Sequence, residues 1–223
     1  MPFCTNLTSM DVSNCTALEN VILWDCTALT TLTGMKKTAC MFVTTENSDN
    51  KAKLQKSIYQ IGQLVRVDDK REIAGSPGVV YLVDGEGQVK IISADEGYTT
   101  FGYYEEDPDN DSNGNGWYNT LRIPDSPAAQ WCTSHGYGWY LPAEEELTIR
   151  YLPKYVNETL EACGYTQMTY NSVYWTSTNQ GNDLADHFCY AISYHNDDDG
   201  GYGRVGQSRD TDTRVRAIYR VSY

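Results

Sequence analysis

The chain has 223 residues, of which 40% are hydrophobic and 21% charged, and its formal net charge is −13. This is enough for one large domain, alone or with a small appendage, and for a packed core. The negative charge repels a phosphate backbone and so argues against a nucleic-acid partner. No segment is apolar enough to span a membrane, and the start MPFCTNLTSM lacks the features of a signal peptide.

Tyrosine and cysteine stand out in the composition. The 18 Tyr far outnumber the four Phe. Tyr joins a rigid apolar ring to a hydrogen-bonding hydroxyl, which suits recognition surfaces, although β-rich domains also use Tyr on their sheets. Seven Cys, an odd number without a CxxC motif, do not form a disulfide framework.

The chain begins with a repeat. CTNLTSMDVSN, CTALENVILWD and CTALTTLTGMK start at Cys4, Cys15 and Cys26, at intervals of 11 residues. A recurring Cys and Leu predict stacked units that bury their apolar faces against one another. The repeat resembles the leucine-rich half-repeats of Bacteroides-type surface proteins. We expect the cysteines to be small buried ladder residues rather than metal ligands, since no His accompanies them. The repeat segment covers residues 1–43, and a polar linker follows over 44–57.

The second predicted domain covers residues 58–223 and begins with strands. GVVYLVDGEGQVKIIS reads as a β-hairpin, in which two β-branched runs flank a Gly-containing turn. DSPAAQWCTSHG predicts a helix with Asp125 or Ser126 as its cap and Gly136 as its end. LPAEEELTIRYL predicts a second helix, and PKYVNETLEACG a third and shorter one that ends at Gly164.

The remainder of the chain predicts strands only. These are VYWTST, HFCYAISYH, YGRVGQS and TRVRAIYRV. Helices in the middle with antiparallel strands at both ends indicate an α+β domain. We expect the final strand to pair near the first hairpin and so to bring the ends of the domain together.

Five blocks of this second domain resemble one known family in their order. They include Trp139–Pro142 followed by Glu146-Leu147, then Tyr174–Thr178, and finally Val215–Arg220. The pattern is similar to the C-type-lectin-fold domain of the Legionella collagen-like protein C-terminal type. The resemblance covers residues 58–223 and implies a C-type-lectin-like α+β fold with short antiparallel sheets and two to three helices.

Domains of this shape also serve as variable proteins of diversity-generating retroelements. Those elements mutate adenines in the 3′ part of a gene and turn Asn codons into Tyr, Asp, Ser, His or Gly codons. Residues 179–212 are rich in these amino acids. The resemblance therefore implies a non-catalytic, adhesin-like binding protein at the cell surface or outside the cell, with a protein or glycan ligand on another surface.

The candidate ligand-binding residues lie between the last scaffold blocks. Tyr offers contact area at low entropic cost, and Asn, Ser and Asp add adaptable hydrogen bonds. The alternative is a solvated hairpin, in which NDDDGG is a turn and Phe188, Ala191 and Ile192 face inward. The candidates are Asn179, Asn182, Asp183, Asp186, His187, Tyr190, Ser193, Tyr194, His195, Asn196, Asp197, Tyr202, Arg204, Gln207, Ser208 and Arg209.

Calcium is the one cofactor for which the sequence contains a partial motif. Asp109, Asp111, Asn113 and Gly114 match the first positions of a D-x-[DN]-x-[DN]-G calcium loop. The twelfth position is Thr120 rather than Glu, and the E-P-N and W-N-D triplets of calcium-dependent sugar binding are absent. A surface loop without metal is the alternative, and we expect no other cofactor.

An enzymatic function finds little support in the sequence. No GxSxG, HExxH or P-loop motif occurs. Formylglycine-generating enzymes share the fold and use a Cys pair, for which Cys163 and Cys189 are the candidates, although two buried structural thiols are the simpler interpretation. A structural module of a surface assembly remains a further alternative. We expect Trp131, Trp139 and Trp175 in the core, and Trp117 as a contact residue or a lid.

Overall fold

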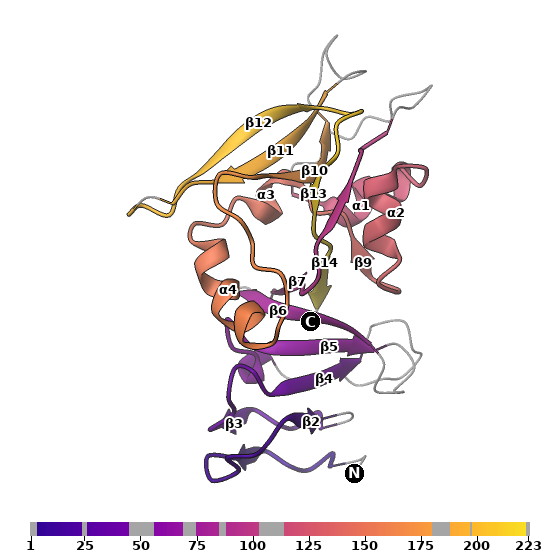
Figure 1. Cartoon of the computed structure of the whole chain (residues 1–223). Coiled ribbons are helices and arrows are strands. Elements are labelled where there is room, and N and C mark those ends of the chain that lie inside the picture. Colours follow the sequence, from indigo (N-terminus) through magenta and orange to yellow (C-terminus); the bar gives the residue numbers. More distant parts are fainter. Residues whose placement is uncertain are drawn as a thin grey trace.

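The structure is a computed structural model that describes residues 4–23, 26–44, 56–68, 75–84, 88–102, 114–179, 188–196 and 198–221. The fold is mixed α+β, as predicted. The strands of the repeat lie at one end of the molecule, and a long ribbon of two strands lies at the other (Figure 1). The first four strands are β1 (Ser9–Asp11), β2 (Asn20–Ile22), β3 (Thr31–Thr33) and β4 (Cys40–Thr44).

The repeat forms stacked half-coils, as predicted. β1 pairs in parallel with β3, and β2 pairs in parallel with β4, so alternate 11-residue units stack on one another. The same turn recurs in each unit: the amides of Leu7, Leu18 and Leu29 donate to the carbonyl oxygens of Cys4, Cys15 and Cys26, each at 3.0 Å. A turn hydrogen bond and an inward Leu therefore define the unit.

The prediction that all three repeat cysteines are buried is wrong for Cys15. Cys26 is buried and Cys4 half-buried, whereas Cys15 is exposed. Cys15 lies on the other side of the coil, because alternate units face opposite sides. There the corresponding turn of the next coil begins with Lys36, which donates to the carbonyl oxygen of Thr16.

A seven-stranded sheet continues the repeat into the rest of the chain. Its order is β2-β4-β5-β6-β7-β14-β9, and β4 pairs in parallel with β5. The sheet thus passes across the predicted linker 44–57, most of which lies outside the described residues, so the predicted domain boundary stays a prediction. The added strands are β5 (Leu64–Asp68), β6 (Ser76–Val83), β7 (Val89–Ser93), β9 (Trp139–Tyr140) and β14 (Ile218–Val221).

The predicted hairpin and its C-terminal partner are both present. β6 and β7 pair in antiparallel fashion, and β14 pairs with β7 through Ile218 and Ile92. The predicted single last strand is two strands, however, because Arg216 turns inward between them. Its guanidinium donates to the carbonyl oxygens of Ser93, at 2.8 Å, and Thr166, at 2.6 Å, and the side chain is 1% exposed.

A five-stranded sheet carries the candidate binding residues. Its order is β12-β11-β10-β13-β8, so β12 is an edge strand. β11 pairs with β12 along its full length and with β10 on its other side. The strands are β8 (Gly97–Thr99), β10 (Val173–Asn179), β11 (Phe188–Tyr194), β12 (Tyr202–Ser208) and β13 (Thr213–Val215).

The helices differ in part from expectation. Ser126 caps α2 by accepting from the amide of Ala129, as predicted, but the second predicted helix is a single turn, α3. It ends early because the chain turns back at Tyr151, whose φ is 62°. α4, expected to be the shorter, is the longer, and α1 was not predicted. The helices are the 3₁₀ turn η1 (Lys56–Ile58), α1 (Gly116–Arg122), α2 (Pro127–Thr133), α3 (Glu144–Leu147) and α4 (Leu152–Ala162).

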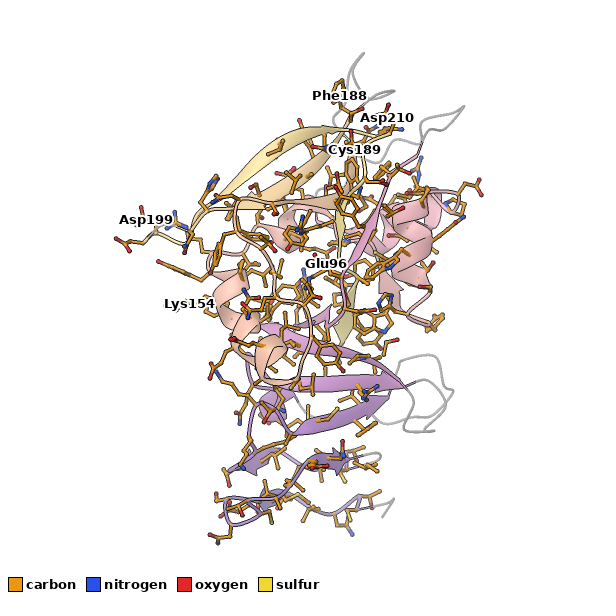
Figure 2. All side chains as sticks on the ribbon, in the orientation of Figure 1. Glu96, Lys154, Phe188, Cys189, Asp199 and Asp210 are labelled. Carbon is orange, nitrogen blue, oxygen red and sulfur yellow. The ribbon has the colours of Figure 1, made fainter. Side chains whose placement is uncertain are left out.

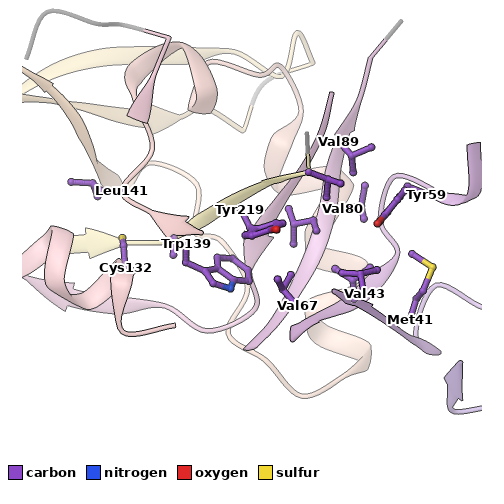
Figure 3. Close-up of a cluster of buried hydrophobic side chains, with 14 of the residues drawn as sticks. Met41, Val43, Tyr59, Val67, Val80, Val89, Cys132, Trp139, Leu141 and Tyr219 are labelled. Carbon is purple, nitrogen blue, oxygen red and sulfur yellow. The ribbon is translucent and has the colours of Figure 1, made fainter. Parts of the chain in front are cut away.

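Two hydrophobic clusters lie on the two faces of these sheets. One joins Met41 and Val43 of the repeat end to Trp139 and Tyr219 (Figure 3). The other packs α3 and α4 against the sheets. Trp139 and Trp175 are buried as predicted, while Trp131 is only partly buried. Among the helices that the structure describes, none is long and apolar enough to cross a membrane.

Candidate functional site

The candidate site is the ribbon, which we define as β11, β12 and the turn between them. Tyr190 lies opposite Gly206, Ile192 opposite Arg204, and Tyr194 opposite Tyr202. Directly opposed residues of antiparallel strands point to the same face, so these six share one face. Eight of the predicted contact residues are exposed or half-exposed: Asn179, Tyr190, His195, Asn196, Tyr202, Arg204, Gln207 and Ser208.

Three predicted contact residues are buried, and the prediction that they lie on the exposed surface is wrong. Tyr194 is 1% exposed, Ser193 9% and Arg209 1%. Tyr194 points toward α3 and donates to the carbonyl oxygen of Leu147 at 2.6 Å, and burial raises its pKa well above the ordinary value. Arg209 lies over the ring of Phe101 and donates to the side-chain oxygen of Asn179 at 3.1 Å.

The burial follows from the sheet being covered on both faces beside β10. Ala191 and Ile192 are neighbours on opposite faces, and both are fully buried. Ser193, opposite Val173 of β10, is covered in the same way. Only β12 and the first part of β11, at Phe188 and Tyr190, extend beyond this cover. An alternating pattern of polar residues therefore did not mean a solvated face here.

Several predicted residues lie outside the described part of the chain. They are Asn182, Asp183, Asp186, His187 and Asp197 of the ribbon region, and Asp109, Asp111 and Asn113 of the calcium loop. Within the described ranges, no group of three or more His, Cys, Asp or Glu side chains could hold a metal ion. The calcium prediction therefore stays a prediction.

Two contacts hold the exposed Arg204 side chain of the ribbon in place. Its guanidinium carbon lies 4.4 Å from the centre of the Tyr190 ring, and its Nε donates to Oε1 of Glu144 at 2.5 Å. Glu144 is buried, with a 7% exposed side chain, whereas the Arg204 side chain is 49% exposed. Partial burial works against the charged form, but the hydrogen bond from Arg204 to Glu144 raises the pKa of Arg204 overall. The site thus presents an exposed guanidinium whose position is fixed by the Tyr190 ring and the buried Glu144 carboxylate.

A polar pocket of about 220 Å³ lies where the ribbon turn meets the start of α4. We call it the ribbon-end pocket. Figure 2 shows Lys154 on α4 near the tip of the ribbon at Asp199. Asp198, Gly200 and Gly201 of the turn contribute to its wall. The side chains that define it are Tyr151, Lys154, Tyr170, Tyr194, His195 and Asn196.

Hydrogen bonds hold the ribbon-end pocket in shape. The Tyr151 hydroxyl donates to the carbonyl oxygen of Asp198 at 3.0 Å, and its amide donates to Gly200 at 3.2 Å. The amide of His195 donates to the carbonyl oxygen of Gly201 at 2.9 Å. Gly200 has a φ of 57°, and a Cβ there would lie 2.1 Å from the Tyr151 ring, so the ring packs directly on the turn.

Sequence reasoning found only one wall of this pocket. Tyr194, His195 and Asn196 were candidates, but Tyr151, Lys154 and Tyr170 were not. Their one signal is the high Tyr content of the chain, which does not single them out. Tyr151 and Lys154 reach the ribbon because α4 begins beside it, and Tyr170 lies just before β10.

A second hollow, of about 490 Å³, lies between α1, α2 and β9 and is mostly apolar. Leu121 and Tyr137 line it and are 60% and 46% exposed. Trp117 forms part of its wall and contacts the rings of Tyr137 and Tyr140 edge-on, each at 6.0 Å between centroids. Trp117 is therefore both a surface residue of this hollow and a partial cover over the core.

The candidate catalytic thiols do not form a pair. Cys189 is buried in one hydrophobic cluster, while Cys163 is half-buried against the other. Burial raises the pKa of the Cys163 thiol. No disulfide bond is formed among the cysteines that the structure describes.

Glu146 of α3 has a structural role. Glu146 accepts hydrogen bonds from the amides of Gly116 and Ala143, each at 3.0 Å, and from the Tyr140 hydroxyl at 2.8 Å. It also pairs with the buried Lys90 ammonium at 3.2 Å. Contacts with α1, β7 and β9 account for the burial of this residue.

Comparisons with known proteins give one distant structural likeness. No protein-family model and no curated protein matches the chain. Among solved structures, a fimbrial protein from Bacteroides ovatus is similar, with 14% identity and a TM-score of 0.43. The likeness covers 60% of this chain and 35% of the fimbrial protein, so the chain spans about a third of that protein's length. At this level the likeness supports no conclusion about function.

Proposed function

We propose that the chain is a non-catalytic ligand-binding protein of a C-type-lectin-like type, which acts at a cell surface and uses the ribbon as its contact region. The observation that carries the proposal is the exposed Arg204, stacked on Tyr190 and anchored by the buried Glu144. A cation that is fixed before binding loses little conformational freedom on contact. Arg and Tyr are also the residues that most often dominate binding energies at interfaces.

The ligand in this proposal is a protein or a glycan on another surface. The net charge of −13 disfavours nucleic acid and other polyanions. Pairing of β14 with β7 closes the second domain on its first hairpin, which supports a C-type-lectin-like arrangement. The position of β12 at the sheet edge supports a ribbon that tolerates sequence change, as a retroelement variable protein requires.

The binding proposal is tested with Arg204→Ala and Tyr202→Ala against glycan arrays and cell-surface protein panels. We expect each substitution to weaken binding of any captured ligand about tenfold or more, which corresponds to about 1.4 kcal/mol. Arg122→Ala and Tyr118→Ala are matched controls, because Arg122 also stacks on an exposed Tyr118 ring, at 5.4 Å, on α1. Equal losses in both pairs, or no captured ligand, would favour a structural module instead.

The proposal that the chain is a retroelement variable protein is tested separately. Sibling sequences from one population should differ mainly within residues 179–212 if the chain is a retroelement variable protein. A neighbouring reverse transcriptase gene and a near-copy of the 3′ end are expected with it. Evenly spread differences would remove this part of the proposal and leave the binding function in place.

Thiol reactivity distinguishes the binding protein from an enzyme of the formylglycine-generating type. We expect Cys189, which is 1% exposed, to react with a disulfide reagent only on unfolding, and Cys163, with its raised pKa, to react slowly. The exposed Cys15 provides the internal reference for a fast reaction. Mass spectrometry of the labelled native protein gives the rates. A Cys163 or Cys189 that reacts faster than Cys15 would support the enzyme.

A further inference from the structure

We infer that the ribbon-end pocket binds one uncharged, pyranose-sized sugar unit of a glycan. This inference rests on the proposed binding function and adds a site and a ligand class to it. The pocket lies beside the ribbon and combines predicted contact residues, His195 and Asn196, with α4 residues that no local pattern indicated.

The size of the pocket limits the ligand to one small unit. Pockets for drug-sized ligands usually measure about 300–1,000 Å³. The ribbon-end pocket, at about 220 Å³, lies below that range. One six-membered ring with its substituents suits this volume, whereas a cofactor or a folded peptide element does not.

The lining matches a ring that carries hydroxyl groups. Tyr170 supplies aromatic ring surface, on which the C–H face of a sugar can pack. Asn196 offers both donors and an acceptor, His195 a ring nitrogen of either kind, and Lys154 up to three donors. Neighbouring donors and acceptors around an aromatic wall suit vicinal hydroxyls better than they suit an apolar side chain.

Charge selects an uncharged sugar. Lys154 stands 5.6 Å from the centre of the Tyr151 ring, and the turn that it faces carries Asp198 and Asp199. The whole chain adds a net charge of −13, which repels phosphorylated and carboxylated ligands at longer range. One local cation among these acids does not make an anion site.

Hydrogen bonds within the protein hold the walls of the pocket together. The bonds from Tyr151 to residues 198 and 200, and from His195 to Gly201, fix the turn against α4. The amide of Asn171 also donates to the carbonyl oxygen of Tyr194 at 2.7 Å. A preformed site loses less entropy on binding, and this matters most for a ligand with few contacts.

The test is a titration of the full chain with a panel of neutral methyl pyranosides, followed by ligand-observed and protein-observed NMR. We expect saturable binding of at least one member with a Kd of about 1 mM, the range for a ligand of this size. Asn196→Ala, Lys154→Ala and Tyr170→Ala should each weaken binding about tenfold. Tyr98→Ala is the control, since Tyr98 is 66% exposed on β8 at the other edge of the sheet.

A bulky substitution in the pocket tests sugar binding in a second way that does not depend on the stability of the protein. Asn196→Trp, at an exposed position, should fill the pocket and abolish sugar binding while thermal unfolding stays within a few degrees of the parent protein. Circular dichroism and thermal unfolding of each variant identify any loss of fold.

Three results would overturn the inference. They are no binding of any pyranoside up to about 50 mM, binding that the pocket substitutions leave unchanged, and pocket-dependent binding of a peptide side chain instead of a sugar. Loss of a captured ligand on Arg204→Ala but not on the pocket substitutions would remove the sugar site and leave the binding function. A captured ligand whose binding is unchanged by both Arg204→Ala and the pocket substitutions would remove the function itself.

Discussion

At the residue scale, two glycines show how the same backbone conformation serves different purposes. Gly200 and Gly164 both have positive φ, 57° and 76°. A Cβ at Gly200 would lie 2.1 Å from the Tyr151 ring, whereas a Cβ at Gly164 meets nothing within 4 Å. The first glycine allows close packing of a ring on a turn, and the second only ends α4.

This difference predicts unequal costs of substitution. Gly164→Ala should lower the free energy of unfolding by about 1 kcal/mol, the cost of a left-handed conformation for Ala. Gly200→Ala should lower it by about 3 kcal/mol, because displacement of the Tyr151 ring adds to that cost. Urea unfolding of the two variants measures both values. Equal values would mean that the ring of Tyr151 is not packed on the turn.

Cys40 gives the stability of the protein a pH dependence in the alkaline range. Burial raises the pKa of this thiol from 9.0 to about 11, although the nearby Arg66 lowers it in part. Between these values the unfolded chain releases the proton while the folded chain still holds it. Stability is therefore full below about pH 9 and falls as the pH rises toward 11.

Cys40→Ala tests this origin of the pH dependence. The parent protein should lose on the order of 1–3 kcal/mol more than the variant between about pH 9 and pH 11. The comparison uses the slope of the free energy of unfolding with pH, so a cavity left by the shorter side chain does not affect it. Parallel slopes for the two proteins would show that the thiol titrates as it does in the unfolded chain.

At the element scale, the two helix N-caps Ser126 and Asn115 make the same kind of hydrogen bond in different environments. Ser126 at the start of α2 is fully buried, accepts from the amide of Ala129 and donates to the carbonyl oxygen of Phe101 at 2.7 Å. Asn115 at the start of α1 is exposed and accepts only from the amide of Tyr118, at 3.1 Å, among the bonds of its side chain that the structure describes.

The two caps should therefore differ on replacement by Ala. Asn115→Ala should cost about 1 kcal/mol, a common value for a helix cap. Ser126→Ala should cost about 2 kcal/mol, because it also leaves the buried carbonyl of Phe101 without its donor. Thermal unfolding of both variants measures this difference. We expect the unfolding midpoint of Ser126→Ala to be the lower of the two. A larger loss for Asn115→Ala would contradict the buried role of Ser126.

Elements with a local signal were the ones that sequence reasoning found. The hairpin β6–β7, the cap of α2 and the 11-residue repeat all depend on residues close in the chain. α3 was predicted too long because its end is set by the return of the chain at Tyr151. α1 was missed because its start lies beside a Gly- and Asn-rich loop, whose composition predicts no helix.

At the scale of the whole molecule, the repeat and the second predicted domain share one sheet and one hydrophobic cluster. β4 pairs with β5, and Met41 lies in the same cluster as Trp139 and Val215. The apolar contacts thus continue from the repeat end into the centre of the molecule (Figure 3). Such contacts make the two parts depend on each other for stability.

This continuity predicts one cooperative unfolding unit. Urea unfolding of the full chain should show a single transition, and the amides of β4 should exchange with the free energy of those in β6 and β7. Hydrogen exchange followed by mass spectrometry measures both regions at once. A β4 that exchanges with a free energy lower by about 2 kcal/mol or more would show that the repeat opens by itself.

The amino-acid sequence alone determined the α+β class, the stacked repeat, the first hairpin and the strand segments of the ribbon, because these follow from short-range periodicity and turn residues. Only the tertiary structure decided which polar residues of the ribbon are exposed. Tyr194 and Arg209 are buried because elements distant in sequence cover both faces of the sheet beside β10. The ribbon-end pocket has the same origin, since its lining comes from the start of α4, from Tyr170 and from the ribbon, which meet only in the folded chain.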